Sequence, residues 1–112
     1  MTPEQKKCKE YLQCYHIGKE NIVSAACLSA ALGISERNIR TVVRVLRRDH
    51  KCPIGSSMGR PSGYYWAATP EELAETIGPL RALATDVQVT LRAMEWNYVK
   101  LGGQMQLLDF KN

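Results

Sequence analysis

The sequence has little of what marks membrane or secreted proteins. Its 112 residues contain no apolar run that approaches the roughly 20 residues needed to cross a bilayer. The N-terminal stretch MTPEQKKCKE is polar from its start and has no apolar segment of the kind found in secretion signals. We therefore expect a cytoplasmic protein that does not associate with membranes.

Motifs for catalysis and for metal binding are also missing. The sequence has no phosphate-binding glycine loop and no histidine–glutamate metal motif, and its two histidines have no recognisable nucleophile partner. The cysteines are Cys8, Cys14, Cys27 and Cys52. None of them forms a CxxC pair, so we interpret them as reduced thiols that fill small gaps, although a site assembled with His16 and His50 is the alternative. The sequence predicts no enzyme, no cofactor and no metal.

The charge is distributed unevenly along the chain. Hydrophobic residues make up 45% and charged residues 23%, which is typical of a folded domain. Residues 36–63 carry seven Lys/Arg against two Asp/Glu, a balance of +5, whereas the preceding residues carry +1 and the following ones −2. A basic segment between near-neutral flanks is typical of a protein that binds a polyanion, although it is also compatible with a solvated helix face.

Three helices are predicted in the first half of the chain. Residues 3–15 follow a capping Thr2, residues 25–32 follow Ser24, and residues 36–49 follow Ser35. Gly33 suits a left-handed turn, so the second and third helices form a helix-turn-helix unit. Between the first two helices we expect a loop over 16–21 and a short strand at 22–23. The apolar residues expected to face the core are Cys8, Tyr11, Leu12, Tyr15, Leu28, Leu32, Ile39, Val42, Val43 and Leu46.

A β-hairpin is predicted after the third helix. Two short segments, 51–55 and 64–67, flank the polar stretch SSMGRPSG, whose glycines and proline indicate a long loop. The second segment contains Tyr64, Tyr65 and Trp66. For these aromatic residues we favour packing of the strand over stacking on bases.

A long amphipathic helix is predicted from residue 69 to residue 101. Its apolar residues recur at alternating spacings of four and three: Leu73, Ile77, Leu80, Ala84, Val87, Leu91, Met94, Tyr98 and Leu101. Pro79 predicts a kink or break. A helix of about 30 residues is about 45 Å long, more than a small domain can cover. We therefore expect a homodimer rather than packing of the helix on its own domain, and the flanking charges leave its orientation open. The residues assigned to dimerisation are Leu80, Val87, Leu91 and Met94.

The tail QMQLLDFKN follows Gly102-Gly103, which is expected to end the helix. Gln104, Met105, Leu107 and Leu108 resemble the peptide that binds bacterial sliding clamps, in which glutamine is followed by leucine or methionine, any residue, leucine, and then phenylalanine or leucine. The alternative is that these apolar residues cover the end of the long helix. The expected organisation is therefore a first domain at 1–68, the long helix at 69–101 and a flexible tail at 102–112.

The stretch LSAALGISERNIRTVVRVLRRDH, residues 28–50, resembles the helix-turn-helix of MarR-type and bacteriophage winged-helix proteins. Gly33 stands at the turn and Ile39 at the buried position six residues later, whereas Ser29 replaces the usual alanine. Residues 59–67 resemble the wing tip and its return strand. The resemblance covers residues 22–68. It implies a mainly α fold with a small β-hairpin wing, followed here by a long C-terminal helix.

Residues that bind DNA are predicted on the exposed face of the third helix. A major groove admits one helix, and its bases are read by arginine and by asparagine or glutamine. To base edges we assign Arg37, Asn38, Thr41 and Arg44. Phosphate contacts are assigned to Ser35 and Arg40, and a minor-groove or backbone contact to Arg60. We interpret Arg47, Arg48 and Lys51 as a solvated basic end of the helix.

Three functions are compatible with these features. The first is a dimeric transcriptional regulator of bacterial or phage origin that binds double-stranded DNA. The second is a replication-associated protein of a phage or mobile element that recruits a sliding clamp through its tail. The third is a winged domain used only for protein contacts. Sequence-specific DNA binding separates the third function from the others.

Overall fold

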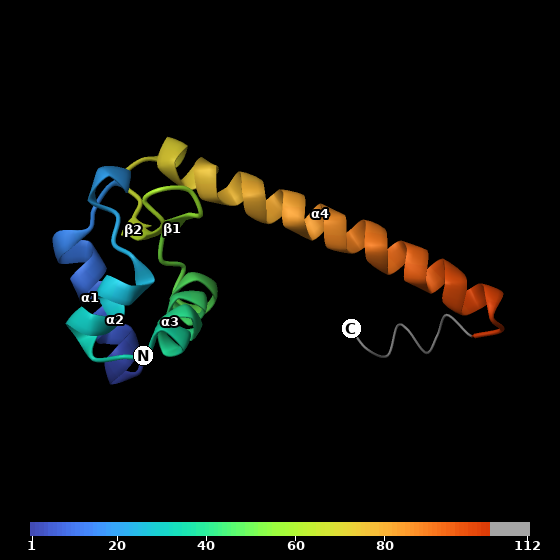
Figure 1. Cartoon of the computed structure of the whole chain (residues 1–112), viewed down its shortest axis with the longest axis horizontal. Coiled ribbons are helices and arrows are strands. Elements are labelled where there is room, and N and C mark those ends of the chain that lie inside the picture. Colours follow the sequence, from blue (N-terminus) through green and yellow to red (C-terminus); the bar gives the residue numbers. More distant parts are fainter. Residues whose placement is uncertain (104–112) are drawn as a thin grey trace. The chain divides into compact units, whose positions relative to one another are not determined.

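The computed structural model describes residues 1–103 as a mainly helical chain with one antiparallel hairpin and a long helix after it (Figure 1). The elements are α1 (Pro3–Tyr15), a 3-10 turn (Lys19–Asn21), α2 (Ala25–Leu32), α3 (Glu36–Asp49), β1 (Ile54–Ser57), β2 (Gly63–Trp66) and α4 (Pro70–Lys100). This coarse architecture confirms the predicted order of helices, hairpin and long C-terminal helix. Two compact units divide the chain, Met1–Ile77 and the residues from Gly78 onward, and each is described by itself.

The first three helices begin and end where their capping residues predict. Thr2, Ser24 and Ser35 each accept a hydrogen bond from the backbone N–H three residues later. Gly33 closes α2 in the left-handed conformation, with φ of 68°, and its N–H donates to the Ser29 carbonyl at 2.9 Å. The predicted pair of helices joined by a glycine turn is therefore confirmed as local structure.

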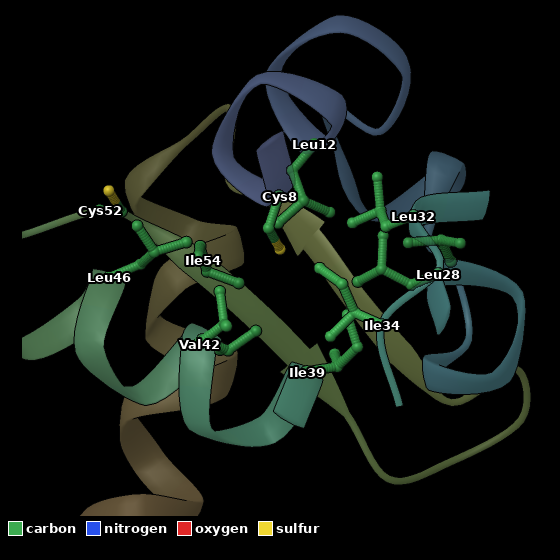
Figure 2. Packing of buried hydrophobic residues seen from close by; sticks show 12 residues of the cluster. Cys8, Leu12, Leu28, Leu32, Ile34, Ile39, Val42, Leu46, Cys52 and Ile54 are labelled. Carbon is green, nitrogen blue, oxygen red and sulfur yellow. The ribbon is translucent and has the colours of Figure 1, made fainter. Parts of the chain in front are cut away.

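The core of the first unit lies between α1, α2, α3 and the hairpin (Figure 2). Its buried residues are Cys8, Leu12, Val23, Leu28, Leu32, Ile34, Ile39, Val42, Val43, Leu46, Cys52 and Ile54. The predicted core faces of α2 and α3 are confirmed. On α1 the prediction for Tyr15 is wrong, because this residue lies in the last turn, is 67% exposed and stacks on the ring of Tyr11 at 5.1 Å.

The hairpin is shifted along the sequence from its predicted position. β1 and β2 pair in a register that joins Ile54 to Trp66 and Ser57 to Gly63, so the loop is shorter than expected. Lys51 has a φ of 53°, a left-handed conformation that cannot continue a strand. The predicted strand at 22–23 is reduced to Val23, which exchanges two backbone hydrogen bonds with Tyr64, at 2.9 and 2.8 Å.

The aromatic residues of β2 point to opposite sides of the hairpin. Tyr64 and Trp66 are partly buried against the core cluster. Tyr65 is fully buried, and its hydroxyl donates to the Glu72 carbonyl at 3.1 Å. Its ring lies over Gly55, where an added Cβ would come within 2.4 Å of Tyr65 Cζ. The prediction that these residues pack the strand is confirmed.

The first two turns of α4 belong to the N-terminal unit. The Thr76 hydroxyl accepts from the Ser56 N–H at 2.9 Å and donates to the Ser56 carbonyl at 3.3 Å. The Glu72 carboxylate accepts from the backbone N–H groups of Lys19 and Ala68, both at 2.8 Å, and these bonds lower the pKa of Glu72. These contacts explain why the unit extends to Ile77.

α4 continues through Pro79 to Lys100, so of the predicted kink or break at this proline the break is wrong. Proline removes one helical hydrogen bond, and the carbonyl that loses its partner belongs to Glu75, an exposed residue. Gly102, with a φ of 95°, ends the helix as predicted. Within residues 1–103, no helix is long and apolar enough to cross a membrane.

Candidate nucleic-acid interface

The third helix has one buried face and one exposed face. Ile39, Val42, Val43 and Leu46 are buried in the core. Because an α-helix repeats every 3.6 residues, the side chains between these positions point away from the core. Six residues predicted to bind DNA lie there and are all exposed: Ser35, Arg37, Asn38, Arg40, Thr41 and Arg44.

Arginines form a stripe along the exposed face of α3. Arg37, Thr41, Arg44 and Arg48 follow one another at spacings of four, three and four, which places them in one line opposite the buried face. Arg40 flanks this line at a distance of three residues from Arg37. We call the arginines of this face, Arg37, Arg40, Arg44 and Arg48, the α3 arginine stripe.

Three of the predicted DNA-binding residues, Ser35, Asn38 and Thr41, differ from the arginines in their surroundings. Asn38 is exposed, but it lies about 100° around the helix from Arg37 and so beside the stripe. Ser35 accepts from the Asn38 N–H at 3.2 Å, so its oxygen already serves as the helix cap. The Thr41 hydroxyl donates to the Arg37 carbonyl at 3.4 Å. The stripe itself therefore consists of arginines with short polar residues between and beside them.

Arg47 has a structural role that the sequence did not reveal. Its Nε donates to the Ile54 carbonyl at 2.9 Å and its Nη2 donates to the Ser56 hydroxyl at 3.1 Å. The guanidinium also lies 6.0 Å from the ring centre of Tyr64. Burial lowers the pKa of Arg47. The interpretation of Arg47 as a solvated basic end is wrong, because this side chain fastens α3 to the hairpin.

Several lysines are also engaged in holding the fold. Lys7 Nζ donates to the Leu32 carbonyl at 2.8 Å and so caps the end of α2. Lys51 Nζ donates to the Arg48 carbonyl at 3.1 Å, close to the end of α3. Lys19 pairs with Glu75 at 2.8 Å. These cations therefore satisfy carbonyl and carboxylate groups of the chain itself.

The stripe differs from these lysines because its guanidinium groups form no hydrogen bond or ion pair with residues 1–103. Among residues 1–103, the pair Lys19–Glu75 is the one ion pair within 4.0 Å. None of the stripe arginines is therefore neutralised by a carboxylate of the described chain. We interpreted Arg48 as part of a solvated helix end, but it belongs to the same line as Arg37 and Arg44. Arg44 and Arg48 follow Arg37 by seven and eleven residues, and this spacing is the signal that identifies the line.

The hairpin loop carries the remaining predicted DNA-binding residue. Arg60 is exposed in residues 58–62, between β1 and β2. The hairpin is fastened to α3 through Arg47, and both elements belong to the unit Met1–Ile77. The unit therefore presents one basic helix and one loop with a single arginine.

The residues assigned to dimerisation lie on α4 and are exposed in the isolated chain. Leu80, Val87, Leu91 and Met94 have exposed fractions of 52%, 57%, 50% and 62%. A row of half-exposed apolar residues of this length is rare on a monomeric surface. The assigned clamp-binding residues, Gln104, Met105, Leu107 and Leu108, lie outside the described residues.

Comparisons with known proteins give no family for this chain: no protein-family model, no curated protein and no solved structure matches it. Within residues 1–103, His, Cys, Asp and Glu side chains form no group of three or more that could hold a metal ion. The exposed basic face of α3 and the hairpin loop beside it are therefore the features that indicate a function.

Proposed function

We propose that this protein binds double-stranded DNA as a winged helix-turn-helix protein, with α3 in the major groove and the hairpin loop against the adjoining backbone or minor groove. The observation that carries the proposal is the α3 arginine stripe, which is exposed and has no carboxylate partner among residues 1–103. Three cations in line on one helix, with Arg40 beside them, suit a surface with regularly spaced phosphates and guanine edges.

The different contacts of the basic side chains support this proposal. Arg47, Lys7, Lys19 and Lys51 bind groups of the chain itself, whereas the stripe arginines have no such function within the fold. Residues 37–48 carry no acidic residue, whereas a merely solvated helix face commonly mixes both signs of charge. Arg60 adds a fifth cation on the hairpin loop.

We also propose that the protein acts as a dimer joined by α4, in the manner of a transcriptional regulator. The support is the row of half-exposed apolar residues on α4. Two copies of the DNA-binding unit would then contact two half-sites.

The test begins with selection of bound duplexes from a random pool, followed by titration of the selected DNA at several salt concentrations. Arg37→Ala or Arg44→Ala is expected to weaken specific binding by about 1–3 kcal/mol and to relax the preference at one base position. Arg40→Ala, which removes a predicted phosphate contact, is expected to make the slope of log affinity against log salt shallower by about one.

Arg92→Ala is the matched control, because it removes the same charge from an exposed residue of α4 outside the unit Met1–Ile77. Binding by this variant should equal that of the wild type. If no duplex is enriched and α3 variants with intact fold bind DNA as the wild type does, the DNA-binding proposal is wrong. The winged domain would then be interpreted as a module for protein contacts.

A further inference from the structure

The apolar positions of α4 define a seam whose residues differ in size along the helix. Within residues 77–101, the seam consists of Ile77, Leu80, Ala84, Val87, Leu91, Met94, Tyr98 and Leu101. The seam residues Leu80, Val87, Leu91 and Met94 are at least half exposed. A single helix cannot bury its own apolar face, so the seam requires a partner helix with matching periodicity.

The orientation of a partner decides which seam residues meet. In a parallel pair of identical helices, residues with equal numbers face each other, so Ala84 would meet Ala84 and Tyr98 would meet Tyr98. In an antiparallel pair the numbers run in opposite directions. Met94 then meets Ala84, Tyr98 meets Leu80, and Leu91 meets Val87. The antiparallel pairing puts a large residue against a smaller one in these three layers and so fills the interface evenly.

The residues beside the seam favour the same orientation. Arg81, Gln88 and Glu95 each follow a seam residue and are spaced by seven, so they lie on one flank. In an antiparallel pair with the register just described, Arg81 of each helix lies beside Glu95 of the other helix, which gives two such pairs. Gln88 of one helix lies beside Gln88 of the other. In a parallel pair these charges face the opposite flank of the partner, which has no charged residue and consists of Thr76, Leu83, Thr90 and Asn97.

From these observations we infer that two copies of this chain pair through residues 77–101 of α4 as an antiparallel two-helix coil. The occupant is a second copy because the charges are self-complementary: Arg81 and Glu95 lie at equal distances on either side of Gln88, as a two-fold axis requires. The inference rests on the dimeric part of the proposed function and is independent of DNA binding.

The test uses charge exchange in the full-length chain, followed by sedimentation equilibrium without DNA. Arg81→Glu and Glu95→Arg each turn two attractive pairs into two repulsive ones, so each is expected to raise the dimer Kd about tenfold. An equimolar mixture of the two variants is expected to recover wild-type affinity, because the heterodimer again has two opposite-charge pairs. Arg92→Glu makes the same change of charge away from the seam and is expected to leave the dimer Kd unchanged.

Cross-linking reads the orientation directly in a Cys14→Ser, Cys27→Ser background, which removes the two exposed thiols. Gln88→Cys is expected to cross-link with a short bis-maleimide, whereas Ala84→Cys is not, since two copies of residue 84 lie about 15 Å apart along an antiparallel pair. The reverse result would establish a parallel dimer and overturn the inference. A full-length wild type that sediments as a monomer at high concentration would overturn it as well, and the DNA selection would still test the other proposal separately.

Discussion

The two units of this chain use the same kind of apolar pattern with opposite results. In Met1–Ile77 the apolar stripes of three helices and a hairpin enclose one another, and residues such as Leu12, Leu28 and Leu46 are fully buried. In the described part of the second unit, apolar residues at helical spacing remain at least partly exposed along α4. Helical periodicity therefore predicts which face needs cover, and the number of elements that surround it determines whether the chain itself provides that cover.

The largest effect is expected when one side chain in each unit is shortened to alanine, and this pair of variants tests the difference between the units. Leu46→Ala removes a fully buried side chain and is expected to lower the free energy of unfolding by about 2–5 kcal/mol, because it leaves a cavity in the core. Val89→Ala changes a residue of α4 that is 63% exposed and lies outside the seam, so its effect should be within about 0.5 kcal/mol. Chemical denaturation followed by circular dichroism measures both. Equal losses in the two variants would contradict the comparison.

A smaller effect is expected from added volume beneath Tyr65. A Cβ at Gly55 would lie 2.4 Å from Tyr65 Cζ, so Gly55→Ala is expected to destabilise the N-terminal unit by about 1–3 kcal/mol. At Gly59 the nearest atom is Ser57 Oγ at 3.7 Å, and Gly59→Ala is expected to be neutral or to stabilise by up to about 1 kcal/mol. Thermal unfolding of the two variants and the wild type measures both changes in stability. A Gly55→Ala variant as stable as the wild type would show that the hairpin is packed more loosely than described.

The smallest effect concerns the cysteines of the N-terminal unit. Cys8 and Cys52 are buried, whereas Cys14 and Cys27 are exposed. Burial, and second the nearby Cys52 thiol, raise the pKa of Cys8 to about 11, and burial raises the pKa of Cys52. At pH 8 a thiol reagent should therefore modify two cysteines quickly in the native protein and all four in denaturant.

The same pKa shift gives a direction for the dependence of stability on pH. The folded state holds the Cys8 proton more tightly than the unfolded chain, whose thiol has the ordinary value of 9.0. The corresponding stabilisation is complete below about pH 9 and is lost as the pH rises toward about 11. The measurement is the fall in the free energy of unfolding between neutral and alkaline pH. This fall should be smaller in the Cys8→Ala variant than in the wild type. An unchanged alkaline profile would exclude Cys8 as its source.

The sequence was sufficient to predict those elements whose signals are local. Thr2, Ser24 and Ser35 act within three residues, and Gly33 requires its own left-handed conformation, so helix ends could be located to the residue. The core faces of α2 and α3 follow from periodicity alone. These features depend little on distant parts of the chain.

The hairpin register and the role of Arg47 depended on contacts that the sequence does not display. Ser56 is polar, yet its backbone pairs in β1 and bonds to Thr76, twenty residues away. Arg47 resembles any basic residue near a helix end until the hairpin returns beside it. The exposure of the predicted α3 residues could be predicted, because it follows from the buried face. The line through Arg48 follows from spacings of four, three and four residues, which the sequence already contains.

The fastening of α3 to the hairpin by Arg47 has a thermodynamic consequence for the proposed binding of DNA. Arg47 bonds to both Ile54 and Ser56, so the helix and the base of the hairpin are already held in one arrangement before any ligand arrives. Each rotamer-rich side chain that must be ordered on binding costs roughly 0.5–1.5 kcal/mol, and the ordering of loops adds to this cost. For α3 and the base of the hairpin, the loss of entropy occurs during folding and not on binding. We therefore expect the unit to bind DNA with little conformational change in its backbone.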